Sequence, residues 1–109
     1  MVAAEVRTSP VALTENARVV LDKRYLLRDR RGEVIETPEG MLARVASAIA
    51  EAEPEAGSGA WAQRYYDAMA ARRFLPNSPT LMNAGTGRGT LAACFVLPVE
   101  DTLESIMAT

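Results

Sequence analysis

Residues 76–97 read PNSPTLMNAGTGRGTLAACFVL and divide the chain into two unlike parts. Prolines and glycines are dense between residues 76 and 89, a pattern that excludes a helix and predicts a polar loop with exposed backbone amides. The apolar run Leu91–Leu97 then predicts a strand that is buried on both faces. Cys94, the single cysteine of the chain, lies on this run. The sequence therefore predicts a loop and a buried thiol that together could hold a small polar substrate against sulfur.

The residues before this loop predict amphipathic helices. The first helix is expected to begin after Thr14, as its N-cap, and to end near Leu27. The second is expected to begin after Thr37, with Pro38 in its first turn, and to end near Ala52. Their apolar stripes recur at three- and four-residue steps: Leu13, Ala17, Val20, Leu21 and Tyr25 in the first, and Met41, Leu42, Val45, Ala46 and Ile49 in the second.

A third helix is expected over about Ala60–Arg72, after a linker at 53–59. Trp61 begins its stripe and is predicted to anchor the core. Residues 1–12 are short, mixed and contain a proline, so we expect a disordered leader there. Three helices can cover one another's stripes, so the expected fold is mainly α. The stripe of the third helix is Trp61, Tyr65, Ala68 and Met69.

The end of the chain predicts the start of a further helix. Asp101 is expected to cap it, with Glu104 three residues later in a capping box. The apolar pattern of this helix has only begun at Thr109. A lone two-sided strand and a short helix need more polypeptide to satisfy their hydrogen bonds and cover their apolar faces, so we expect the chain to be the front end of a larger protein.

Composition narrows the function classes. The formal net charge is -2, and the charges are dispersed, which argues against a nucleic-acid or membrane-surface partner. No apolar run approaches the ~20 residues of a membrane span, and no signal peptide is recognisable, so a cytoplasmic protein is expected. With no histidine and one cysteine, the chain offers no soft-ligand metal site and no internal disulfide.

Each of these features also has an ordinary structural interpretation. A lone buried cysteine such as Cys94 is most often a packing residue. The stretch 76–86 could be a domain connector, and Asp101 could be a helix cap alone. Their order within one short stretch is what favours a functional interpretation.

The motifs in this order resemble those of a known enzyme family. Residues 73–86, RFLPNSPTLMNAGT, and 91–106, LAACFVLPVEDTLESI, closely resemble the adenosylcobalamin-dependent (class II) ribonucleotide reductases. Residues 13–17, LTENA, and 23–27, KRYLL, resemble the opening of the same family. The resemblance covers most of this chain but only a small N-terminal part of the family's polypeptide. It implies a helical N-terminal domain at 13–87, then at 88–109 the first strand and the start of a helix of a ten-stranded α/β barrel.

The resemblance also implies site residues. Cys94 would be one of the two thiols that reduce the ribose and are left as a disulfide, with its partner outside this chain. The nucleotide substrate would contact Ser78, Thr80, Ala93 and Cys94. A nucleotide effector would contact Asp101, Thr102 and Leu103, where a carboxylate can accept from a sugar hydroxyl.

The implied cofactor is adenosylcobalamin, bound by parts of the enzyme that this chain lacks. The implied partners are the rest of the reductase and an external dithiol reductant. The leading hypothesis is therefore the N-terminal portion of a ribonucleotide reductase, inactive alone. Two alternatives stay open: one half of a split enzyme, and a small helical binding module without catalysis.

Overall fold

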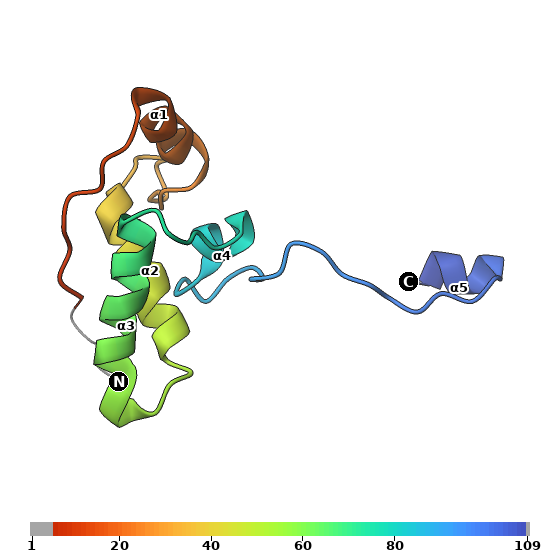
Figure 1. Ribbon diagram of the computed structural model, residues 1–109. Coiled ribbons are helices and arrows are strands. Elements are labelled where there is room, and N and C mark those ends of the chain that lie inside the picture. The colour runs from red at the N-terminus through yellow and green to blue at the C-terminus, as the bar shows by residue number, and fades with distance from the viewer. Residues whose placement is uncertain (1–5, 109) are drawn as a thin grey trace.

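The computed structural model describes residues 6–108, and its helices account for nearly all of the regular structure. They are α1 (Glu15–Arg24), α2 (Pro38–Ala50), α3 (Glu55–Ala70), α4 (Ser78–Asn83) and α5 (Leu103–Ala108) (Figure 1). Between residues 6 and 108 the only β pairing is an isolated bridge between Arg28 and Val34. The mainly α prediction is confirmed for this part of the chain. None of the described helices has the length and apolar character needed to cross a bilayer.

The predicted starts of α1 and α2 are confirmed by their caps. Thr14 Oγ1 accepts from the Ala17 N–H at 3.1 Å, and Thr37 Oγ1 accepts from the Gly40 N–H at 3.0 Å. Pro38 is in the first turn of α2, where its missing N–H costs nothing. Both helices end two to three residues earlier than expected.

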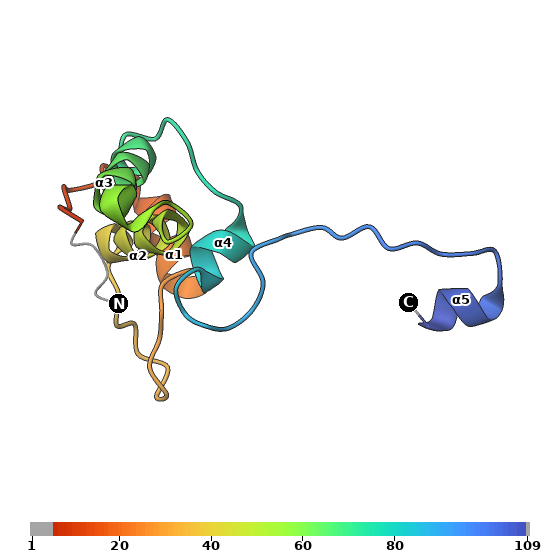
Figure 2. The same ribbon diagram turned by 90° about the horizontal axis from the view of Figure 1, so that it is seen from below.

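The core lies mainly between α2 and α3, which pack side by side in Figures 1 and 2. Tyr66 and Ala62 of α3 have no exposed surface, and Val45 and Ala46 of α2 are 1% and 0% exposed. The remaining buried members of this core are Val11, Leu26, Met41, Leu42, Met69, Leu81 and Ala84.

The structure corrects the prediction for α3 in two ways. The helix begins at Glu55, so most of the expected linker at 53–59 is helical. Its buried residues are Ala62, Tyr66 and Met69: Met69 was expected, whereas Ala62 and Tyr66 are buried in place of the preceding residues Trp61 and Tyr65, and Trp61 is 38% exposed. The Arg64 guanidinium lies 4.8 Å from the Trp61 ring centroid. The indole is therefore covered by a cation–π contact at the surface instead of anchoring the core.

The expected disordered leader is wrong for residues 6–12, whereas residues 1–5 lie outside the described residues. The hydroxyl of Tyr66 donates to the Ser9 carbonyl at 2.8 Å and accepts from the Ser9 N–H at 3.1 Å. The Val11 N–H donates to Glu39 Oε1 at 3.1 Å, and the Val11 side chain is only 5% exposed. This segment is therefore attached to α2 and α3 by hydrogen bonds and by an apolar anchor.

The stretch 76–97 departs most from expectation. Prolines and glycines do not exclude a helix there, because Asn77 caps α4 through a 3.0 Å bond from the Thr80 N–H, Pro79 lies in the first turn, and the glycines follow the helix. The predicted strand Leu91–Leu97 is absent from the described structure, and these residues are exposed in an extended segment that leads away to α5 (Figures 1 and 2). A strand needs a neighbouring backbone, and no described segment lies alongside.

Candidate functional site

Helix α4 is linked to the segment that carries the thiol. Thr80 Oγ1 donates to the Leu91 carbonyl at 3.0 Å, and the Asn83 side-chain amide donates to the Thr90 carbonyl at 2.9 Å. The Thr80 side chain is nearly buried, at 8% exposed. Because both bonds attach the backbone just before Cys94 to α4, the position of α4 fixes where the thiol segment begins.

Ser78 lies at the other end of α4, on the surface. Its Oγ is 2.8 Å from the Tyr25 hydroxyl, directly after α1. Each hydroxyl can both donate and accept, so the pair can be rearranged around a polar ligand without leaving a buried group unsatisfied. The bond also fixes the start of α4 relative to α1.

Ala93 and Cys94 both lie in the extended segment and are exposed. The prediction that Cys94 is buried is therefore wrong in this chain. An exposed thiol retains access to solvent and to other molecules, which a redox cysteine requires and a packing cysteine does not.

Asp101, Thr102 and Leu103 lie at the start of α5, separated from α4 by the extended segment (Figure 1). Asp101 does not cap this helix as predicted. Thr102 does, since its Oγ1 accepts from the Ser105 N–H at 3.1 Å. The structure thus brings Ser78 and Thr80 together with the start of the thiol segment, and it leaves the Asp101 region apart from them.

Sequence reasoning missed a partly buried ion pair beside α4. Arg44 of α2 and Glu36 form this pair at 2.8 Å, with side chains 12% and 9% exposed. Arg44 also donates to the carbonyls of Leu81 and Ala84 at the end of α4. The only signal in the sequence is a charged residue next to the apolar stripe of α2, and many solvated arginines give the same signal.

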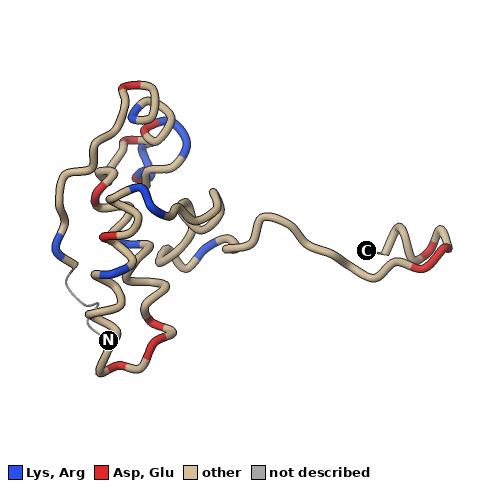
Figure 3. Tube along the Cα trace, viewed as in Figure 1, with Lys and Arg blue, Asp and Glu red and all other residues tan. Residues whose placement is uncertain are grey.

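Apart from the Arg44–Glu36 pair, charge is sparse along α4 and the segment that follows it. Arg88 is the only charged residue from 74 to 99, and Figure 3 shows clusters of acidic residues at the turn between α2 and α3 and near the start of α5, away from α4. Within residues 6–108, no three side chains of the His, Cys, Asp or Glu type gather as a metal site. Recognition near α4 therefore depends on hydroxyls, amides and backbone groups.

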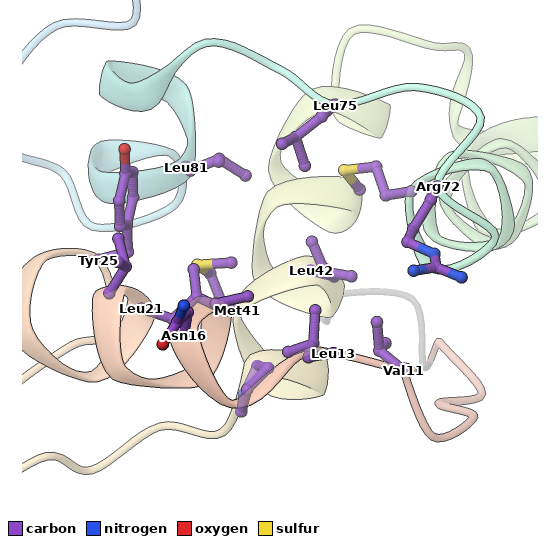
Figure 4. A pocket seen from close by; sticks show the side chains of 14 residues that line it. Val11, Leu13, Asn16, Leu21, Tyr25, Met41, Leu42, Arg72, Leu75 and Leu81 are labelled. Carbon is purple, nitrogen blue, oxygen red and sulfur yellow. The ribbon is translucent and has the colours of Figure 1, made fainter.

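Two clefts adjoin α4. One, of about 430 Å³, lies between α1, α2 and α4, and apolar side chains such as Leu21, Met41 and Leu81 point into it (Figure 4). The other, of about 440 Å³, lies between the end of α2 and the glycine-rich turn at 85–89. Only the second presents a mixture of backbone and polar side-chain groups, because glycines leave their amides uncovered.

Comparisons with known proteins give one family. The family model for the ribonucleotide reductase all-alpha domain matches residues 11–89. The chain is 45% identical over 108 residues to a vitamin B12-dependent ribonucleoside-diphosphate reductase of Mycobacterium tuberculosis, covering 96% of this chain and 15% of that protein. A protein of the same name from Thermoplasma acidophilum is 34% identical, with 89% of this chain and 20% of that protein covered.

Relatives of a different name are also similar. The ribonucleoside-diphosphate reductase large chain of Schizosaccharomyces pombe is 41% identical over 90 residues, covering 82% of this chain and 10% of that protein. This chain thus spans a fifth or less of the length of these relatives. The match over 11–89 includes α1 to α4 together with Ser78 and Thr80. The chain therefore belongs to the ribonucleotide reductases, and it carries their all-alpha domain.

Proposed function

We propose that this chain is the N-terminal part of a vitamin B12-dependent ribonucleotide reductase, and that it positions the substrate and supplies one reducing thiol. The observation that carries the proposal is 45% identity along nearly the whole chain to a reductase named as B12-dependent. The bonds from Thr80 and Asn83 to residues 90–91 support it, because they connect a surface of hydroxyls to the backbone that leads to Cys94.

In this role Ser78 would hydrogen-bond the ribonucleotide, and Ala93 would line the same pocket. The bond from Thr80 to Leu91 supports a second task for Thr80, which is to fix the thiol segment beside the substrate. Reduction replaces the 2' hydroxyl of the ribose by hydrogen and releases water, while two thiols lose their protons and electrons and form a disulfide. The chain has one cysteine, so the second thiol belongs to another part of the enzyme.

Adenosylcobalamin, when bound, supplies the radical that starts this chemistry. Residues 6–108 do not fit it: the clefts beside α4 are about 430 and 440 Å³, a volume for a drug-sized ligand, and a corrin is larger. No step involving the cofactor is therefore assigned to residues of this chain.

The proposal includes a second nucleotide site. Asp101, Thr102 and Leu103 would contribute to an effector site in which the Asp101 carboxylate accepts from a sugar hydroxyl. Thr102 already caps α5, which leaves the exposed Asp101 carboxylate for another use. The apolar residues 91–97 would become the first barrel strand once the rest of a cytoplasmic reductase covers them, with residues 13–87 as the helical domain and 88–109 as the start of the barrel.

The test is Cys94→Ser in the complete reductase, with dithiothreitol as the reductant that regenerates the pair. We expect multiple turnover to be abolished while substrate binding persists, because serine keeps the size of the side chain and cannot form a disulfide. Thr86→Ser, in the turn after α4, is the matched control and should turn over normally. Undiminished deoxyribonucleotide production by Cys94→Ser would remove this thiol from the mechanism.

A further inference from the structure

Arg44 is the most heavily bonded side chain next to the proposed substrate residues. Its Nε donates to Glu36 Oε2 at 2.8 Å, and its Nη2 donates to Glu36 Oε1 at 3.0 Å, so the pair is bidentate. Both side chains are nearly buried. A buried ion pair adds little net stability compared with apolar residues of similar volume, and geometric specificity is a better reason to keep one.

The remaining donors of Arg44 point to the end of α4. Nη1 donates to the Ala84 carbonyl at 2.6 Å, and Nη2 also donates to the Leu81 carbonyl at 2.9 Å. The last carbonyls of a helix lack partners within the helix, and a cation there also complements the helix dipole. Helix α4 has only six residues, too few to persist without such support.

We call the bonds from Arg44 to Glu36 and to the carbonyls at the end of α4 the Arg44 clamp. Through α4 the clamp is connected to the proposed substrate contact and to the segment that carries the thiol. Ser78 lies at the first position of α4, and Arg44 holds the last turn. Thr80 and Asn83, within the same helix, hold the backbone at 90–91. Any shift of α4 at Arg44 would therefore move Ser78 and the start of the Cys94 segment together.

We propose that Arg44, oriented by Glu36, is a positioning residue of the reductase: from α2 it fixes α4, and thereby the substrate-contacting Ser78 and the segment that carries Cys94. Arg44 touches backbone only in this region and takes no part in the chemistry itself. The inference has two halves. The structural half, that Arg44 fixes α4, stands by itself. The catalytic half, that this position of α4 is needed for reductase activity, rests on the proposed function.

Hydrogen exchange on this 109-residue chain tests the structural half. Arg44→Lys keeps the charge, but a single ammonium cannot span Glu36 and two carbonyls as a planar fork does. We expect exchange about tenfold faster at the amides of Leu81 and Ala84, on the scale of losing one charge-assisted bond. The α2 and α3 core amides should be unchanged. Arg30→Lys, in an exposed turn, is the control. Equal exchange at α4 in both variants, or equal acceleration throughout the core, would overturn the clamp.

Two glycines provide a second, matched pair. Gly85 and Gly87 both have positive φ, 79° and 73°, so alanine is strained at either position. A Cβ on Gly85 would lie 3.0 Å from Arg44 Cγ, whereas one on Gly87 would meet nothing within 4 Å. We expect Gly85→Ala to accelerate exchange in α4 more than Gly87→Ala does. Identical profiles would contradict the role of Arg44.

Kinetics of the complete reductase test the catalytic half. For Arg44→Lys we expect kcat/KM to fall about tenfold, the same loss as above. The effector dissociation constant should stay unchanged, because Asp101 lies just before α5, beyond the extended segment that follows α4. Adding Glu36→Gln to Arg44→Lys should lower kcat/KM little further, because the two residues act as one unit.

Wild-type kcat/KM in Arg44→Lys, with faster exchange in α4, would refute the catalytic role of Arg44. A wild-type enzyme without reductase activity would refute the proposed function and leave the exchange result valid.

Discussion

Tyr66→Phe removes one oxygen atom from the centre of the domain. The ring of Tyr66 is fully buried, and phenylalanine can keep all of its packing. The hydroxyl makes two bonds to Ser9, at 2.8 and 3.1 Å, and a typical bond contributes about 0.5–1.5 kcal/mol net. Ser9 is exposed, so water can replace part of the loss. We therefore expect a decrease of about 1–2 kcal/mol in the free energy of unfolding.

Urea denaturation of the 109-residue chain measures this loss. With a slope of about 1.5 kcal/mol per molar, the midpoint should fall by about 1 M. Tyr65→Phe is the control, since its hydroxyl donates to Glu53 at a more exposed position, and its effect should be smaller. Hydrogen exchange at the Ser9 amide should accelerate only in Tyr66→Phe. An unchanged midpoint, or equal losses in the two variants, would refute the attachment of residues 6–12 through Tyr66.

Three further outcomes are expected. Val45→Ala should destabilise the chain by about 2 kcal/mol in the same denaturation assay, because two buried carbon groups are lost and a cavity remains. The hydrogen bond from the Val11 N–H lowers the pKa of Glu39, so stability that is present above the unfolded pKa should be lost as the pH falls through the folded pKa. Glu39→Gln should weaken this dependence of stability on pH in a pH series of denaturation curves, and an unaltered dependence would contradict the assignment. Tyr25→Phe in the complete reductase should raise the substrate KM about threefold, with kcat unchanged, because the Ser78 hydroxyl loses its partner; no change in KM would count against Ser78 as a substrate contact.

The sequence was most informative where structure depends on near neighbours. Thr14 and Thr37 cap helices because a hydroxyl placed before a helix reaches an amide three residues on, whatever surrounds it. The stripe of α2 was predicted well, from Met41 to Ala46, since helical spacing sets which residues share a face. Ile49, the last member, is 38% exposed.

The predictions failed for the core residue of α3 and for helix α4, because the structure there depends on residues elsewhere in the chain. In α3 the expected core anchor Trp61 is 38% exposed and Tyr66 is fully buried, because the packing of α2 against α3 decides which side of the helix is covered. Helix α4 was missed because its stability comes from Asn77 and from Arg44, a residue 40 positions away from Ala84. For the candidate site, sequence patterns and the family resemblance gave Ser78 and Thr80, whereas the Arg44 contacts required coordinates.

The apolar run 91–97 shows a different limit. Its composition is that of a strand, but strand formation requires backbone donors and acceptors from a neighbour. Phe95 and Val96 are 67% and 97% exposed here. The residue types of this run favour a strand, and the described structure has no strand there because no neighbouring backbone pairs with it.

The attachment of residues 7–11 to α3 has a consequence for the order of folding. Arg7 and Ser9 bond to Gln63 and Tyr66, residues 56 and 57 positions later, whereas α2 and α3 meet across a short turn. Closing a short loop is fast and closing a long one is slower, so the helical pair can assemble first. Residues 7–11, which are synthesised before α2 and α3, are thus fixed after them, when they pack back against a helical hairpin that already exists.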